Sequence, residues 1–110
     1  MLYSISDIIV TVDANGRIDY CNPAGIEWLG FSEQQIQGQF LELIMSSYPS
    51  KEHLSNWVHR ALEFGKEHHG VATISRLSSP NTASNVNIQV NPLIHNNIGD
   101  KGAMVILRTL

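Results

Sequence analysis

Cysteine is nearly absent from this chain of 110 residues, which contains only Cys21. A single cysteine cannot form a disulfide within the chain, and a zinc site built on several cysteines is excluded as well. We interpret Cys21 as a small core or sheet residue. Its thiol also favours a reducing compartment, and we expect a cytoplasmic protein.

Clustered basic residues and long apolar runs are also missing. The seven Lys and Arg residues are scattered, and ten Asp and Glu residues bring the net charge to −3. Nucleic-acid binding therefore has no electrostatic support. No apolar run approaches the roughly 18 residues that cross a bilayer. The N-terminus lacks the basic-then-apolar pattern of a signal peptide, so we expect no membrane contact by this segment.

Two strands and a turn are predicted at the start of the chain. Residues 8–12 form a β-branched run that is typical of a strand. Asn15 and Gly16 supply the positive φ angles of a tight turn. Residues 17–21 then alternate in the manner of a return strand. The segment therefore predicts a β-hairpin.

Short helices punctuated by glycine are predicted next. Asn22 is suited to cap the first helix, Pro23 fits its first position, and Gly30 ends it. Ser32 caps a second short helix, which closes at Gly38. Residues 40–45 add one more apolar turn, and residues 46–50 are predicted to form a loop.

The longest helix is predicted over residues 51–64. Apolar side chains recur there with the spacing of one helical stripe: Leu54, Trp57, Val58, Ala61 and Leu62. Gly65 is the stop signal of this helix. The stripe predicts an amphipathic helix that packs on a sheet.

The remainder of the chain has β character. Strands are predicted over residues 69–77, 85–91 and 103–107, with a loop over 78–84 and a turn over 96–102. The middle strand alternates between apolar and amide side chains, so one of its faces is buried and the other polar. The element order predicts an α+β fold, a five-stranded antiparallel sheet with short helices and one longer helix on one face.

The first half of the chain resembles the PAS family. Residues 7–24 read DIIVTVDANGRIDYCNPA and residues 28–38 read WLGFSEQQIQG. They are similar to the family patterns Asp-x-x-Gly-Arg-Ile-x-x-x-Asn-Pro-Ala and Leu-Gly-Tyr/Phe-Ser/Thr-x-x-x-Ile-x-Gly. The resemblance implies one PAS domain over residues 1–110, excised from a longer multidomain protein of bacterial signalling. A scaffold alone does not fix a function.

Two features depart from the family pattern. Residues 78–84 replace the Asp-Gly turn that is usual between the third and fourth strands. The segment 107–110 lacks the Asp that PAS domains often carry where they join an output helix. Coupling to an effector is therefore the part of the resemblance that this sequence supports least.

The same resemblance bears on cofactor chemistry. Light-oxygen-voltage domains require a Cys in an Asn-Cys-Arg-Phe-Leu stretch, but residues 38–43 contain none, which excludes a covalent flavin. Haem-binding PAS domains often take the iron ligand from the long helix. His59 lies on the polar side of that helix and His53 at the edge of the apolar stripe, so His53 is the candidate ligand only if haem is bound. We expect no cofactor.

Metal and catalytic motifs are weak. His68 and His69 are adjacent on a strand and face opposite ways, and His95 has no ligand motif beside it. We expect no metal site and interpret these histidines as solvated. The sequence has no Gly-x-Ser-x-Gly elbow and no phosphate loop, so we expect no enzyme activity.

A ligand pocket is predicted between the inner face of the sheet and the short helices. Its candidate lining residues are apolar: Ile36, Phe40, Ile44, Trp57, Val58, Leu62 and Ile88. Trp57 could stack on a ligand ring or fill the core, and for every residue of the set core packing is the simpler interpretation.

The first and last strands are apolar on both faces, which is typical of central strands. Helices cover only one face of such a sheet, so the outer face is predicted to form a homodimer, with Ile9, Val105 and Leu107 as candidate contacts. Two functions stay open. The domain either senses a small molecule and gates a histidine kinase or diguanylate cyclase, or it is a ligand-free dimerisation module.

Overall fold

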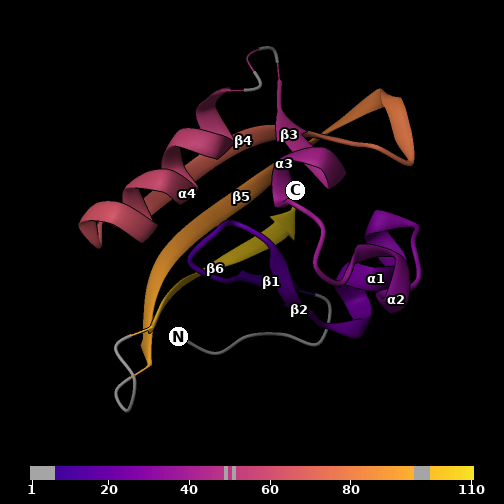
Figure 1. Ribbon diagram of the computed structural model, residues 1–110. Helices are drawn as coiled ribbons and strands as arrows, with labels where there is room; N and C mark the ends of the chain where they lie inside the picture. Colours follow the sequence, from indigo (N-terminus) through magenta and orange to yellow (C-terminus); the bar gives the residue numbers. More distant parts are fainter. Residues whose placement is uncertain (1–6, 49, 51, 96–99) are drawn as a thin grey trace.

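The first and last strands of the chain lie side by side in the middle of one antiparallel sheet (Figure 1). The computed structural model describes residues 7–48, 50, 52–95 and 100–110. Its elements, in chain order, are β1 (Ile8–Val12), β2 (Ile18–Cys21), α1 (Pro23–Leu29), α2 (Glu33–Ile36), α3 (Leu41–Ile44), β3 (Met45–Ser47), α4 (Glu52–Phe64), β4 (His68–Arg76), β5 (Ser79–His95) and β6 (Asp100–Thr109).

The sheet has the strand order β2-β1-β6-β5-β4-β3. In the central pair, Ile8 lies opposite Leu107 and Val12 opposite Ala103. Figure 1 shows α4 lying along the sheet, with α1 and α2 gathered at the other end. The face that the helices cover is called the inner face below, and the opposite one the outer face.

The core fills the space between the inner face and the helices. Leu54, Val58 and Ala61 of α4 are buried at the spacing of one helical stripe. They meet inward side chains of the sheet such as Val90 and Val105, both fully buried. Each large apolar side chain buried in this way stabilises the fold by about 1.5–3 kcal/mol. The α+β fold and the helices on one face are confirmed.

The strand count of the sequence analysis is wrong by one. The sheet has six strands among the described residues, because Met45–Ser47, expected in a helical turn and a loop, pairs with Ile74–Arg76 as β3. The loop over residues 78–84 is also wrong. The chain turns at Leu77 and Ser78, and β5 already begins at Ser79. The predicted turn over 96–102 falls partly on residues 96–99, outside the described residues, and its last residues belong to β6.

The β1–β2 turn forms where it was predicted but with a different backbone. Gly16 has a φ of +80°, whereas no described residue other than glycine has a positive φ. The Gly16 N–H donates to the Asp13 carbonyl at 3.0 Å. The Asp13 side chain accepts from the N–H groups of Asn15 and Arg17. Only Gly16 therefore supplies the left-handed angle, and Asn15 does not.

Asn22 caps α1 as predicted and also joins the helix to β1. Its side-chain oxygen accepts from Gly25 N–H at 2.8 Å and from Ile9 N–H at 3.0 Å. Its amide nitrogen donates to the Asp7 carbonyl at 2.7 Å. One side chain thus satisfies a free helix donor and two backbone groups of the neighbouring segment.

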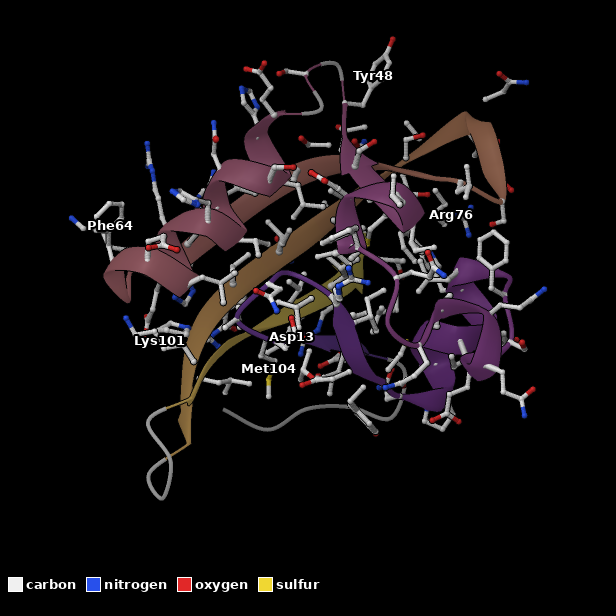
Figure 2. The ribbon with its side chains drawn as sticks, in the orientation of Figure 1. Asp13, Tyr48, Phe64, Arg76, Lys101 and Met104 are labelled. Carbon is white, nitrogen blue, oxygen red and sulfur yellow. The ribbon has the colours of Figure 1, made fainter. Side chains whose placement is uncertain are left out.

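The C-terminal end of α1 is held by the turn between β4 and β5. Arg76 donates to the Trp28 carbonyl at 2.7 Å, and its guanidinium lies 4.6 Å from the centre of the Trp28 ring. The Ser78 hydroxyl donates to the Leu29 carbonyl. Figure 2 shows Arg76 on the side of the sheet where α1 lies. These donors satisfy carbonyls that a helix end leaves open.

Two of the three predicted dimer contacts face the wrong way. Val105 and Leu107 are fully buried, because their pairing with Val10 and Ile8 points all four side chains toward the helices. A continuous apolar run does not reveal this parity. Ile9, the third candidate, is partly exposed. Met104, labelled in Figure 2, precedes the inward Val105 on β6, so its side chain lies on the outer face and is also partly exposed.

Candidate functional site

A cleft of about 370 Å³ opens between the β1–β2 turn, α3 and α4. We call it the α3–α4 cleft. Its walls are formed by residues 14–16 of the turn, by residues 40–42 at the start of α3, and by one flank of α4. The lining residues from α4 are Leu54, Ser55, Asn56, Val58, His59, Leu62 and Glu63.

Backbone hydrogen bonds hold the turn against the start of α3. The Leu41 N–H donates to the Gly16 carbonyl at 3.1 Å, and the Ile18 N–H donates to the Gln39 carbonyl at 2.8 Å. Arg17 reinforces this link, since its guanidinium lies 4.4 Å from the centre of the Phe40 ring and donates to the Gly38 carbonyl at 3.1 Å. The wall of the cleft opposite α4 is therefore built by contacts between distant parts of the sequence.

The cleft has an apolar floor and a polar rim. Leu41, Leu54 and Val58 are buried beneath it, and Phe40 and Leu62 are partly buried beside them. The rim carries amide, hydroxyl, imidazole and carboxylate groups: Asn15, Glu42, Ser55, Asn56, His59 and Glu63. An apolar site with a few polar groups at its edge is the usual composition of a small-molecule site.

The predicted pocket residues divide into three groups. Phe40, Val58 and Leu62 line the α3–α4 cleft. Ile36, Ile44 and Ile88 are buried in the core and are absent from its lining. Trp57 lies on another flank of α4, where its ring stacks on His68 with centroids 3.9 Å apart.

The polar rim was not predicted from the sequence. Ser55, His59, Leu62 and Glu63 recur at i, i+4, i+7 and i+8 along α4, which is a second stripe beside the buried one. This periodicity is visible in the sequence, but the contribution of the β1–β2 turn is not, because it depends on long-range pairing.

The histidines of α4 differ in their surroundings. His53 is exposed and outside the cleft lining, with its ring centre 6.0 Å from that of Trp57. His59, which was assigned to the polar side of the helix, lies on the rim of the cleft. Among the described residues, no three His, Cys, Asp or Glu side chains are grouped closely enough to hold a metal ion.

His68 joins α4 to β4 through its stack on Trp57. Partial burial lowers the pKa of His68 below its ordinary value of 6.5, and the charges of His69 and Arg60 lower it further. Neighbouring His69 is exposed and lies 3.3 Å from the carboxylate of Glu67. The two adjacent histidines therefore have separate environments, as alternation along a strand requires.

Cys21 is buried on β2, directly behind α1. A Cβ atom built on Gly25 would lie only 2.5 Å from its sulfur, which shows how closely helix and strand approach. Burial raises the pKa of Cys21 to about 11, and the charge of Glu33 adds to the effect. The thiol is therefore protonated at neutral pH, and Cys21 is not among the described residues that line the α3–α4 cleft.

The structure is an α+β domain with a cleft beside its longest helix. The family model described as PAS fold matches residues 2–110. The chain belongs to the PAS family, and a PAS domain is generally a non-catalytic sensory module. Within the described part of the chain, no helix is both long and apolar enough to cross a membrane.

Solved structures of PAS and related domains are similar in fold. A PAS domain from Colwellia psychrerythraea is 23% identical, with a TM-score of 0.76 over 96% of this chain and 86% of that one. The PAS domain of nitrogen regulation protein NR(II) from Vibrio parahaemolyticus is 18% identical, with a TM-score of 0.72 over 96% and 90%.

A fungal LOV domain photoreceptor is 17% identical, with a TM-score of 0.76 over 99% of this chain and 78% of that one. No curated protein sequence matches the chain. At these identities the likeness establishes the fold and leaves the ligand open.

Proposed function

We propose that this PAS domain is a cytoplasmic sensor that binds a small ligand non-covalently in the α3–α4 cleft. In this proposal the ligand regulates an effector of the histidine kinase or diguanylate cyclase type in the same parent chain. The observation that carries the proposal is the cleft itself. Its volume of about 370 Å³, apolar floor and polar rim match the ordinary dimensions and chemistry of a small-molecule site.

The position of α4 offers a route from ligand to output. The helix contacts β3, β5 and β6 on the inner face, and it also forms one wall of the cleft. A ligand that favours one spacing between α4 and the β1–β2 turn would shift the helix on β5 and β6. Such a ligand changes the conformational equilibrium by the difference between its affinities for the two arrangements.

A pair of tryptophan substitutions tests the proposal. Leu62→Trp would fill the cleft from α4, whereas Val71→Trp adds the same side chain on the outer face, where Val71 is 68% exposed. Native mass spectrometry of the purified domain would detect a retained metabolite, and amide spectra would locate its site. We expect Leu62→Trp to abolish retention and Val71→Trp to keep it. Equal retention by both variants would contradict binding in this cleft.

Homodimerisation through the outer face is the second candidate function. The composition of that face favours dimerisation. Ile9 and Met104, which are both partly exposed, form an apolar zone on β1 and β6 together with Ile106, which is only 5% exposed, and a row of amides on β5 lies beside them. Those amides are Asn87, Gln89 and Asn91. Because an amide both donates and accepts, such a row can pair with its own copy across a two-fold axis. The proposed occupant of this face is therefore a second copy of the chain.

Light scattering after size-exclusion chromatography tests the dimer. Val71→Glu places a charge on the outer face, while Leu77→Glu places one at another exposed apolar position, in the β4–β5 turn. We expect the first variant to be monomeric and the second to remain dimeric. A wild-type domain that stays monomeric at high concentration would overturn this candidate. A dimer with an empty cleft would instead support a ligand-free dimerisation module.

A further inference from the structure

The charged side chains that line the α3–α4 cleft are acidic. Glu42 reaches the cleft from α3 and Glu63 from α4, and His59 is the only other ionisable residue among the described lining residues. Lys and Arg are absent from the described lining residues. The rim therefore carries two carboxylate side chains above an apolar floor.

Glu42 faces α4 across the cleft. The Ser55 hydroxyl of α4 lies 3.5 Å from the Glu42 carboxylate, a long and exposed contact between the two walls. Glu63 lies one helical turn beyond His59 and two turns beyond Ser55, on the same flank of α4. The two carboxylates therefore border the cleft from two different elements.

Neighbouring cations do not neutralise these acids. Arg17 is occupied elsewhere, with its guanidinium over Phe40 and one N–H donated to the Gly38 carbonyl. Arg60 and Lys66 lie three positions before and after Glu63 in the sequence, but no ion pair joins either of them to Glu63 among the described residues. Within the described residues, neither Glu42 nor Glu63 forms an ion pair.

We infer that the α3–α4 cleft selects a small organic cation, an amine or ammonium group on an apolar body. The apolar body packs on Phe40, Leu54, Val58 and Leu62, and the cationic group lies at the rim between Glu42 and Glu63. A carboxylate of the same shape would be repelled by both acids and would find no basic partner. This inference rests on the proposed function, because it names the ligand class of the same cleft.

Three phenyl compounds of matched shape test the selection. They are 2-phenylethylammonium, 2-phenylethanol and 3-phenylpropionate, titrated separately into the isotopically labelled domain. Amide resonances of Leu54, Val58 and Leu62 report on the cleft. We expect the ammonium to bind most tightly and the carboxylate most weakly, with roughly a tenfold difference between them, since each exposed ion pair contributes only modestly.

Neutral amides at the two acids provide the matched variants. Glu42→Gln and Glu63→Gln keep the shape of each side chain, and each should reduce the ammonium preference about two- to fivefold. Glu27→Gln on α1 removes an exposed acid outside the cleft and should leave the preference unchanged.

The neutral alcohol separates the two proposals. If the alcohol binds in the cleft as tightly as the ammonium, or if the carboxylate binds as tightly as the ammonium, the cation inference is overturned and the proposed function stands. If none of the three shifts the cleft resonances, the proposed binding site and the inference both fall. An ammonium preference that is undiminished in both the Glu42→Gln and the Glu63→Gln variant also overturns the inference.

Discussion

Arg108 donates two hydrogen bonds to the carboxylate of Asp7, at 3.1 and 3.0 Å, although the two residues lie 101 positions apart. The Asp7 side chain is only 1% exposed, whereas that of Arg108 is 53% exposed. These hydrogen bonds and the charge of Asp7 raise the pKa of Arg108. The Asp7 carbonyl accepts from Asn22, so the end of β6, the start of β1 and the cap of α1 form one connected group.

Asp7→Asn should therefore destabilise the fold. The amide keeps the size of the carboxylate but cannot accept both guanidinium hydrogen bonds as an anion, and a hydrogen bond to a charged group is worth about 1.5–3 kcal/mol. We expect the free energy of unfolding in urea to fall by about this amount. Arg108→Gln should act in the same direction, because it removes the ion pair that Arg108 forms with a buried carboxylate.

Lys66→Gln is the control for this pair, since it removes an exposed positive charge that lies between α4 and β4. The urea midpoint of the Lys66→Gln variant should match that of the wild type. The double variant Asp7→Asn, Arg108→Gln should cost less than the sum of the single changes, because they share one interaction. Additive costs would show that the two side chains act independently.

Gly25→Ala should destabilise the domain even though alanine favours helices. The new methyl group would lie 2.5 Å from the Cys21 sulfur, and overpacking of this kind costs about 1–3 kcal/mol. Cys21→Ala removes the obstructing sulfur, so the cost of Gly25→Ala should shrink in that background. Gly70→Ala is the control, since its nearest atom would be 3.8 Å away on the His68 ring. The same cost with and without Cys21 would locate the strain elsewhere.

Short-range signals in the sequence were enough to predict the α1 region and the general fold. Asn22, Pro23 and Gly30 act locally, and each has its predicted role. The third strand was missed because Met45–Ser47 is short and is defined only by pairing with β4, about thirty positions away. The start of β5 was missed because Pro80 and Asn81 are common turn residues, yet they belong to β5, at an irregularity in its pairing with β4.

The face on which a side chain lies and the residues that line the cleft could not be predicted without the register of the strands. The run from Ala103 to Leu107 is apolar throughout, so only its pairing with β1 shows that Val105 points inward. The cleft likewise combines α4, predicted from its periodicity, with a turn that packs beside it through long-range hydrogen bonds. Three of the seven predicted pocket residues line it, since an apolar stripe marks burial without distinguishing core from cleft.

Two arginines make the same pair of interactions at different depths, which predicts unequal costs of replacement. Arg76 contacts the ring and carbonyl of Trp28 in a partly buried place, and Arg17 contacts Phe40 and the Gly38 carbonyl at the surface. Lysine keeps the charge but loses the planar guanidinium. We expect Arg76→Lys to cost about 1–2 kcal/mol and Arg17→Lys less than about 0.5 kcal/mol in urea unfolding. Equal costs would contradict a role for burial.

The stack of His68 on Trp57 predicts that acid weakens the domain. Because partial burial holds the pKa of His68 below 6.5 in the folded state, the unfolded chain takes up this proton first as the pH falls. The contribution of neutral His68 to the free energy of unfolding is fully present above pH 6.5 and is lost as the pH falls toward the folded-state pKa of His68. We expect urea midpoints at about pH 7.5 and about pH 5.5 to differ more for the wild type than for His68→Gln.

His59→Gln is the control for this measurement, since it removes an exposed histidine from α4, the helix that carries Trp57, and leaves the stack of Trp57 on His68 intact. Its stability should keep the full loss between the two pH values. A glutamine side chain cannot stack on Trp57 as an imidazole does, so the absolute stability of the His68→Gln variant should fall at both pH values. The decisive quantity is therefore the difference between the two midpoints, and an unchanged difference in His68→Gln would assign the acid sensitivity to other groups.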